Sequence, residues 1–149
     1  MTAMDFSTLG DRIGQEIAVS PWFDVTQARV DAFAEATDDR QWIHVDPVKA
    51  AAQSPFKSTI AHGFLTLSLV SVLLRSTFTF TGKMAINYGV NRVRFVSAVP
   101  VGSRLRGRFT PGAVLAVDGA VQVTWKVTVE REGHQKPAAV IEWIVRYYV

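Results

Sequence analysis

Two side chains in one polar stretch have the types and the spacing needed for acid–base chemistry. Asp39 and His44 lie five residues apart within the segment DDRQWIH. An imidazole titrates near neutral pH, and a nearby carboxylate can orient a water molecule that both groups share. The spacing therefore permits activation of water. The alternative interpretation is a turn-capping aspartate beside a half-buried structural histidine.

The glycine that begins the following apolar helix could complete such a site. Free N–H groups and the positive end of the helix dipole at Gly63 suit a negatively charged oxygen, although a glycine there is also typical of a tight turn. His62 could be a second catalytic histidine or could hydrogen-bond to backbone. Ser71, two turns further on, could support a carboxylate or bond its own helix. Asp38 and Asp46 have simple capping roles open to them.

The sequence lacks the motifs that are typical of several other classes of enzyme. Three histidines and scattered acids form no HxH or HExxH pair on one element, so we expect no metal site. GxSxG, GxGxxG and Walker patterns are absent as well. The chain has no cysteine, which excludes disulfides and thiolate chemistry. His134 follows Gly133 in a predicted hairpin, where we expect it to face solvent.

The elements that position these residues follow from hydrophobic periodicity and capping signals. Residues 63–76 are apolar on nearly every face, which predicts a helix that is buried on most sides and is too short to span a membrane. The polar stretch with Asp39 and His44 is predicted as a loop between two further helices. These helices run from the N-cap Thr26 to about Ala36 and from Asp46-Pro47 to about Gln53.

After the apolar helix the pattern changes to strands. They follow the helices without alternating with them, so we expect an α+β domain in which an antiparallel sheet wraps around the helix at 63–76. The strongly apolar last strand would favour pairing between chains if it lay at an edge. Predicted strands cover a short edge segment within 16–23, weakened by Pro21, and residues 85–96, 104–110, 114–130 and 138–149, with turns at 100–102, Pro111-Gly112 and 131–133.

Composition limits the compartment and the partners. With 149 residues and 48% hydrophobic content the chain can bury a sizeable core, and we expect a single domain, 1–149. Residues 1–15 are expected to be a lead-in segment anchored by Phe6, Leu9 and Ile13. A formal charge of +3 without a basic run gives no reason to expect nucleic acid. The N-terminal stretch lacks a secretory pattern, so we expect a cytoplasmic protein without membrane association.

Taken in order, these motifs resemble the MaoC-like hydratases and dehydratases, which include the (R)-specific enoyl-CoA hydratases. The resemblance covers about residues 10–149. Within it, DDRQWIH is similar to the NodN-like branch, because Gln41-Trp42 stands where many members have Asn-Pro and Asp38 where many have Gly. The matching segments are ATDDRQWIHVD at 36–46, IAHGFL at 60–65 and, more weakly, residues 88–95 and 100–102.

The resemblance implies a hot-dog fold, in which a curved antiparallel sheet wraps around the central helix, and usually a homodimer with a continuous sheet. It also implies that Asp39 and His44 activate water, that the Gly63 N–H donates to a thioester oxygen, and that Ser71 supports the acid. The expected activity is addition of water to a trans-2-enoyl-CoA to give a (3R)-hydroxyacyl-CoA in fatty-acid metabolism. Coenzyme A is part of that substrate, and no separate cofactor is expected.

Two other functions stay open. A 3-hydroxyacyl dehydratase of fatty-acid synthesis would run the same chemistry in reverse on acyl carrier protein, and a non-catalytic hot-dog subunit would bind acyl chains or stabilise a partner. A hot-dog thioesterase is less expected, because residues 63–75 contain no acid. Basic residues that could meet the phosphates of coenzyme A are Lys57, Arg92, Arg94 and Arg104, and apolar residues that could line an acyl tunnel are Trp42, Phe56 and Phe64.

Overall fold

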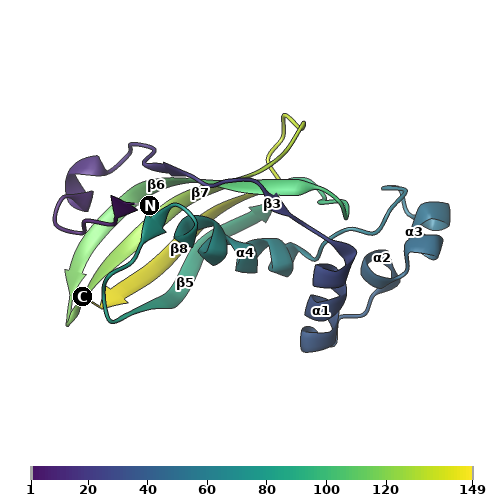
Figure 1. The fold of residues 1–149 in the computed structure, drawn as a ribbon, viewed down its shortest axis with the longest axis horizontal. Coiled ribbons are helices and arrows are strands. Elements are labelled where there is room, and N and C mark those ends of the chain that lie inside the picture. The colour runs from purple at the N-terminus through teal and green to yellow at the C-terminus, as the bar shows by residue number, and fades with distance from the viewer. Residues whose placement is uncertain (1, 149) are drawn as a thin grey trace.

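A curved antiparallel sheet wraps around one helix in the computed structural model, which describes residues 2–148 (Figure 1). Helix α4 (Gly63–Arg75) lies against the concave face of the sheet, and three smaller helices gather beyond one end, away from the two termini. The predicted α+β architecture with a central helix is confirmed. The other helices are the 3-10 helix η1 (Leu9–Arg12), α1 (Gln27–Thr37), α2 (Trp42–Val45) and α3 (Pro47–Gln53).

The main sheet has the strand order β2-β6-β7-β8-β5, and β3 also pairs with β6. All pairings in this sheet are antiparallel. The strands β1 and β4 form a separate, parallel pair near the N-terminus. The bounds are β1 (Thr2–Ala3), β2 (Ala18–Val19), β3 (Phe23–Asp24), β4 (Phe78–Thr79), β5 (Met84–Phe95), β6 (Arg104–Val117), β7 (Ala120–Arg131) and β8 (Ala139–Tyr148).

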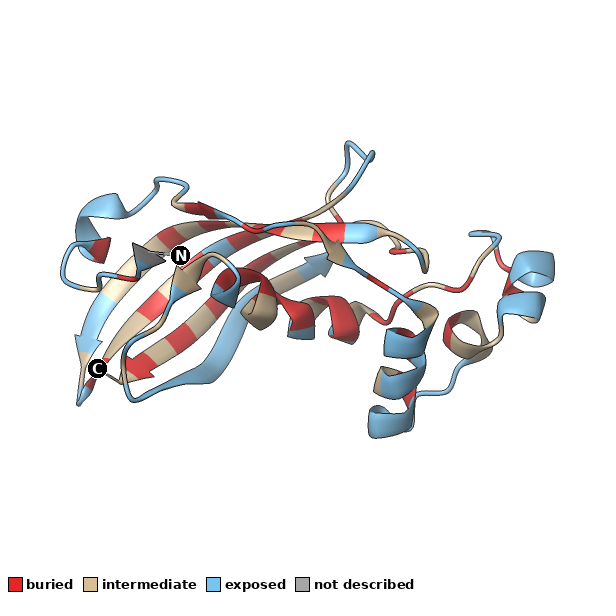
Figure 2. Cartoon of the chain, viewed as in Figure 1, coloured by how far each residue is buried: buried red, intermediate tan, exposed pale blue. Residues whose placement is uncertain are grey.

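The core lies between α4 and the concave face of the sheet. Buried residues alternate along β6, β7 and β8, as the banding in Figure 2 shows, because successive side chains of a strand point to opposite faces. Trp125 and Phe109 are fully buried and meet edge to face, with their ring centroids 6.3 Å apart. The helix buries Leu65, Leu69, Val70, Leu73 and Leu74, which explains its lack of a polar stripe.

The predicted helix starts are confirmed by their capping hydrogen bonds. The hydroxyl of Thr26 accepts from the N–H of Arg29 at 3.3 Å, and the carboxylate of Asp46 accepts from the N–H of Lys49 at 2.9 Å. The stretch between these helices was predicted as a loop throughout, and that is wrong for residues 42–45, which form α2. In the lead-in segment Leu9 is buried, whereas Ile13 is 48% exposed and does not anchor it.

One predicted turn is wrong. Strand β6 continues through Pro111 and Gly112 with only a register shift against β7, and the chain reverses at residues 118–119. Gly119 has φ +69°, a conformation that glycine adopts without steric cost. Pro111 is tolerated because its missing N–H is not needed there. Its carbonyl oxygen still accepts from the N–H of Gly14 at 2.9 Å.

The exposed edge of the sheet is β5. The last strand, β8, pairs with β7 on one side and β5 on the other, so it does not lie at an edge and the condition for its pairing between chains is not met. Nearly every residue of β5 is exposed, and β5 is the pale blue strand in Figure 2. At the opposite side the predicted edge strand is split into β2 and β3 around Ser20-Pro21. Within the described residues no helix has the length and apolarity of a membrane span.

Candidate active site

Helices α1 and α2 place Asp39 and His44 on either side of a tight corner. Asp38 ends α1 in the left-handed conformation, with φ 59°, which aspartate tolerates better than most residues and glycine adopts freely. Its carboxylate is bound by Arg40 at 2.6 Å. Gln41 then occupies the N-cap position of α2 without making a side-chain cap, and His44 lies on the single turn that follows. The corner turns the chain back, so that both predicted residues face the start of α4.

A backbone carbonyl fixes the tautomer of His44. Its Nδ1 lies 2.7 Å from the carbonyl oxygen of Ile60, and a carbonyl can only accept, so Nδ1 carries the proton. Ile60 is itself held by its N–H bond to the carbonyl oxygen of Ile43 at 3.0 Å. In the neutral ring Nε2 is then left with its lone pair free. Burial lowers the pKa of His44, and the adjacent His62 lowers it further, so the neutral base is the favoured form.

His62 packs directly on this base. The two imidazole rings stack with their centroids 3.8 Å apart and their planes at 23°, and the ring of Phe33 also packs on His62, with centroids 4.9 Å apart. Nε2 of His62 donates to the carbonyl oxygen of Asp39 at 2.9 Å. The predicted hydrogen bond from His62 to backbone is therefore present. Its Nδ1 is buried and has no partner among the described residues.

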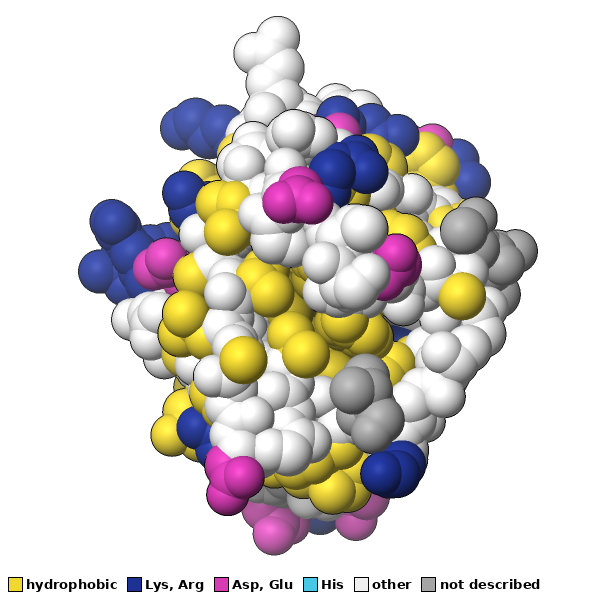
Figure 3. Space-filling view, turned by 90° about the vertical axis from the view of Figure 1, so that its left-hand side faces the viewer, with side chains coloured by type: hydrophobic (Ala, Val, Ile, Leu, Met, Phe, Trp, Pro, Cys, Tyr) yellow, Lys and Arg dark blue, Asp and Glu magenta, His cyan; other side chains and the backbone are white. Residues whose placement is uncertain are grey.

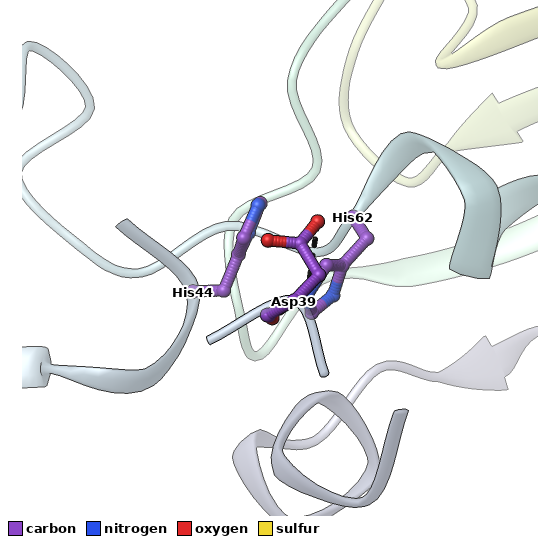
Figure 4. A group of neighbouring side chains, drawn as sticks. All are labelled: Asp39, His44 and His62. Atoms are coloured by element: carbon purple, nitrogen blue, oxygen red, sulfur yellow. Dashed lines mark hydrogen bonds and ion pairs between the residues drawn. The ribbon is translucent and has the colours of Figure 1, made fainter. Parts of the chain in front are cut away.

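The carboxylate of Asp39 reaches into the same cluster. A carboxylate oxygen of Asp39 and one ring nitrogen each of His44 and His62 lie within 4.8 Å of one another. Figure 4 shows the carboxylate turned toward the two rings. The Asp39 side chain is 56% exposed, while both histidines are buried. A gap of this size between a carboxylate and an imidazole can be bridged by one water molecule. The structure thus brings together the two residues that the sequence singled out.

These three side chains also form the group best suited to a metal ion among the described residues, which sequence spacing did not reveal. One feature of the geometry argues against an ion. The stacked rings of His44 and His62 project their lone pairs in nearly parallel planes, whereas ligands of one metal must converge on it. The absence of a metal stays a prediction.

Gly63 starts α4 beside the cluster and tolerates no side chain in the present packing. A Cβ at this position would lie 2.7 Å from the ring of Phe95. The N–H groups of the first helical turn have no acceptor within the helix, so they can donate to a ligand. Ser71 lies two turns along α4, about 12 Å from Gly63 on the helix axis, and lines a cavity with Asn87 and Trp143. Its role as a support for Asp39 stays a prediction.

Gln27 is a residue that sequence reasoning missed. Its amide Nε2 donates to the carbonyl oxygen of His44 and to the carboxylate of Asp31, each at 2.8 Å. The hydroxyl of Thr59, which is buried, donates to its Oε1 at 2.5 Å. Gln27 therefore connects α1 to the turn that carries His44 and to the segment that leads to Gly63. These partners are 17 and 32 residues away, so no local pattern could indicate them.

The remaining candidates lie outside this cluster. Asp46 caps α3, as predicted, and His134 is exposed near the β7–β8 turn. Among the proposed phosphate contacts, Arg104 is bound to Glu132, which leaves Lys57, Arg92 and Arg94 as exposed cations. Phe56 and Phe64 are 45% and 69% exposed, too open to wall a buried tunnel within this chain.

Comparison with known proteins identifies the class. Residues 8–133 match the MaoC like domain, and the chain therefore belongs to the MaoC-like dehydratase family. The prediction of this family, and with it the hot-dog fold, is confirmed. The solved (R)-hydratase of A. caviae involved in PHA biosynthesis superposes with a TM-score of 0.66 at 27% identity, covering 89% of this chain and 98% of that one.

Two curated relatives are nearer in sequence. The 3-hydroxyacyl-thioester dehydratase Z of Mycobacterium tuberculosis is 52% identical over 136 residues, which cover 90% of this chain and 89% of that protein. Nodulation protein N of Rhizobium leguminosarum is 45% identical, with 97% and 91% coverage. These matches confirm the predicted NodN-like branch. The chain is thus a homologue of a hydro-lyase.

Proposed function

We propose that this protein is an (R)-specific enoyl-CoA hydratase, which adds water to a trans-2-enoyl-CoA and also catalyses the reverse dehydration. The observation that carries the proposal is the fixed tautomer of His44, which leaves Nε2 as a free base on a ring that shares one cluster with the Asp39 carboxylate. The names of the relatives support the reaction class, since one is a 3-hydroxyacyl-thioester dehydratase and another an (R)-hydratase.

In the proposed mechanism one water molecule lies between Asp39 and His44. It donates one hydrogen to the Asp39 carboxylate and the other to Nε2 of His44, so its lone pair faces C3 of the enoyl group. His44 takes the proton as the C3–O bond forms. The negative charge that develops on the thioester oxygen is stabilised by the Gly63 N–H. The protonated His44 then returns its proton to C2, and the site is regenerated.

The proposal also includes the oligomeric state of the protein. Strand β5 leaves one side of its backbone unpaired and exposes apolar side chains, an arrangement that favours pairing with a second copy. We infer a homodimer with a continuous sheet across β5. The exposed apolar residues of this edge are Met84, Ile86, Tyr88, Val90 and Phe95. A cytoplasmic location and a single domain spanning the chain belong to the same proposal.

A direct assay tests the reaction. Loss of absorbance at the enoyl thioester band is followed with crotonyl-CoA and longer trans-2-enoyl-CoAs, and the same acyl groups are offered on acyl carrier protein. In the reverse direction, (3R)- and (3S)-hydroxybutyryl-CoA are compared. The proposal predicts hydration of CoA thioesters and dehydration of the (3R) isomer only. Activity confined to the carrier-protein thioesters would favour a dehydratase of fatty-acid synthesis, and inertness toward all substrates would favour a non-catalytic subunit.

A further inference from the structure

His62 contacts both residues of the proposed acid–base pair. Its Nε2–H donates to the carbonyl oxygen of Asp39 at 2.9 Å, and its ring stacks on that of His44 with centroids 3.8 Å apart. His62 is also the N-cap residue of α4 and directly precedes Gly63. One side chain therefore joins the backbone that carries the acid, the ring of the base and the start of the helix.

The hydrogen bond to Asp39 fixes the tautomer of the neutral His62 ring. A carbonyl oxygen can only accept, so the proton lies on Nε2 and the lone pair lies on Nδ1. This Nδ1 is buried and has no partner among the described residues. A buried acceptor without a partner costs free energy, because its hydrogen bond to water is lost on folding. Packing alone therefore does not explain why a histidine occupies this position.

The two contacts of His62 explain its residue type. Phenylalanine would stack on His44 without leaving a nitrogen unpaired, but it has no donor for the carbonyl oxygen of Asp39. Glutamine would supply the donor, but it presents no ring to His44. Histidine meets both requirements with one side chain, and the unpaired Nδ1 is the consequence.

The surroundings of His62 hold it in place. The residue is 3% exposed, and the ring of Phe33, on α1, packs on it with centroids 4.9 Å apart. Its carbonyl oxygen accepts from the N–H of Thr66 at 3.2 Å. These contacts lie where α1, α2 and the start of α4 meet, away from the termini, whereas Figure 3 views the opposite end, where hydrophobic side chains gather in a hollow. His62 is thus fixed in both its ring and its backbone.

We propose that His62 is a positioning residue, which sets the separation of the Asp39 carboxylate and the His44 base by holding the backbone of one and the ring of the other. This inference rests on the function proposed above. His62 exchanges no proton with the substrate, because its Nδ1 is enclosed and its Nε2–H is bound to the Asp39 carbonyl oxygen. Its Nε2 lies 4.0 Å from the nearer carboxylate oxygen of Asp39, beyond hydrogen-bond distance.

Two substitutions separate the two contacts. His62→Phe keeps a ring against His44 and removes the donor, whereas His62→Gln keeps a donor and removes the ring. The matched control is His134→Phe, which makes the same change at an exposed histidine. With folding verified by thermal melting, kcat and KM are measured with crotonyl-CoA, and His62→Phe is also combined with Asp39→Asn.

We expect His62→Phe to lower kcat about tenfold or more with little change in KM, since a misplacement of 1 Å can cost about 10²-fold. In the Asp39→Asn background the same substitution should cause little further loss, because the position of the carboxylate matters only while the carboxylate is present. His134→Phe should behave as wild type. Wild-type kcat in a folded His62→Phe variant, or losses that multiply in the double variant, would overturn the proposal.

A second measurement does not depend on turnover. In His62→Gln the remaining histidines are His44 and His134, so the ring nitrogens of His44 can be followed by nitrogen NMR. The wild type should show one protonated and one unprotonated nitrogen in His44. His62→Gln should partly average the two signals, because a ring without its stacking partner can rotate away from the carbonyl oxygen of Ile60.

Unchanged His44 signals in His62→Gln would overturn the role of His62 in holding the base. If the wild type hydrates no thioester, the hydratase function fails, and the NMR comparison then decides by itself whether His62 positions His44. Averaged signals in His62→Gln would support the positioning role in that case as well.

Discussion

The Nδ1–H of His44 donates to the carbonyl oxygen of Ile60 across 2.7 Å, which joins the turn of α2 to the segment that leads into α4. This single bond orients the base toward the side on which the Asp39 carboxylate lies, and it also fixes which nitrogen carries the proton. The pKa of His44 is lowered for a different reason, chiefly the burial of the ring and then the adjacent His62, and the bond to Ile60 opposes this shift only in part.

The pH dependence of turnover should follow the pKa of His44. Because that pKa is lowered in the folded protein, the neutral base persists as pH falls, and kcat/KM should decline only below the ordinary histidine value of about 6.5. His62→Gln keeps a donor near the carbonyl oxygen of Asp39 but removes a ring whose charge opposes protonation of His44. The acidic limb of the kcat/KM profile should then move to higher pH. His134→Asn, a change at an exposed histidine, should not move it. If the acidic limb of the kcat/KM profile stays in place in His62→Gln, the proposed effect of His62 on the protonation of His44 is contradicted.

Gln27 should act as a positioning residue for His44. Gln27→Met preserves the size of the side chain but removes its bonds to His44 and Thr59. We expect kcat to fall about tenfold or more with little change in KM, since a misplacement of 1 Å can cost about 10²-fold. Asp31→Ala removes only the exposed partner of the same amide and should have no such effect. Equal losses in the two variants would mean that Gln27 merely supports the helix.

The close approach of Gly63 to Phe95 predicts a specific defect in Gly63→Ala. The added methyl group would overlap the Phe95 ring, so either the ring or the start of α4 must shift. We expect a loss of about 1–3 kcal/mol in unfolding free energy, as is usual for overpacking, together with a lower kcat. Gly10→Ala, where nothing lies within 4 Å, is the control. Adding Phe95→Ala should restore stability, and failure of this rescue would show that the clash is not the cause.

The β5 edge predicts the oligomeric state. Sedimentation of the wild type should give a dimer, and Ile86→Glu should shift it toward the monomer, because like charges near a two-fold axis repel each other. Leu115→Glu introduces the same charge at an exposed position near the β6–β7 turn and should leave the dimer intact. A monomeric wild type, or a dimer insensitive to Ile86→Glu, would contradict pairing through β5.

Local signals predicted the helices that carry their own caps. The N-cap residues Thr26 and Asp46 predict the starts of α1 and α3, and the apolar run from Gly63 predicts α4. The short helix α2 was missed because Gln41-Trp42 provides neither a side-chain cap nor a proline at its start. The sequence predicts a turn at Pro111-Gly112 because proline and glycine usually interrupt strands, yet β6 continues through both residues.

The pairing of Asp39 with His44 could be predicted because both residues lie in one short segment. The stacking of His44 on His62 could not, because it depends on α4 folding back against α2. Which late strand forms the sheet edge could not be predicted, for a similar reason. Both β5 and β8 are rich in apolar residues, and only the pairing order decides which of them lies inside the sheet.

The central claim is that Asp39 and His44 together activate water, and the most direct test is the hydration rate of three single variants with crotonyl-CoA. Asp39→Asn removes the carboxylate, His44→Asn keeps a donor for Ile60 but removes the base, and Asp38→Asn changes only the adjacent exposed acid. With folding verified by thermal melting, the first two should lose at least about 10²-fold in kcat/KM, while Asp38→Asn retains the wild-type rate. Near wild-type hydration by a folded Asp39→Asn or His44→Asn variant would contradict the account.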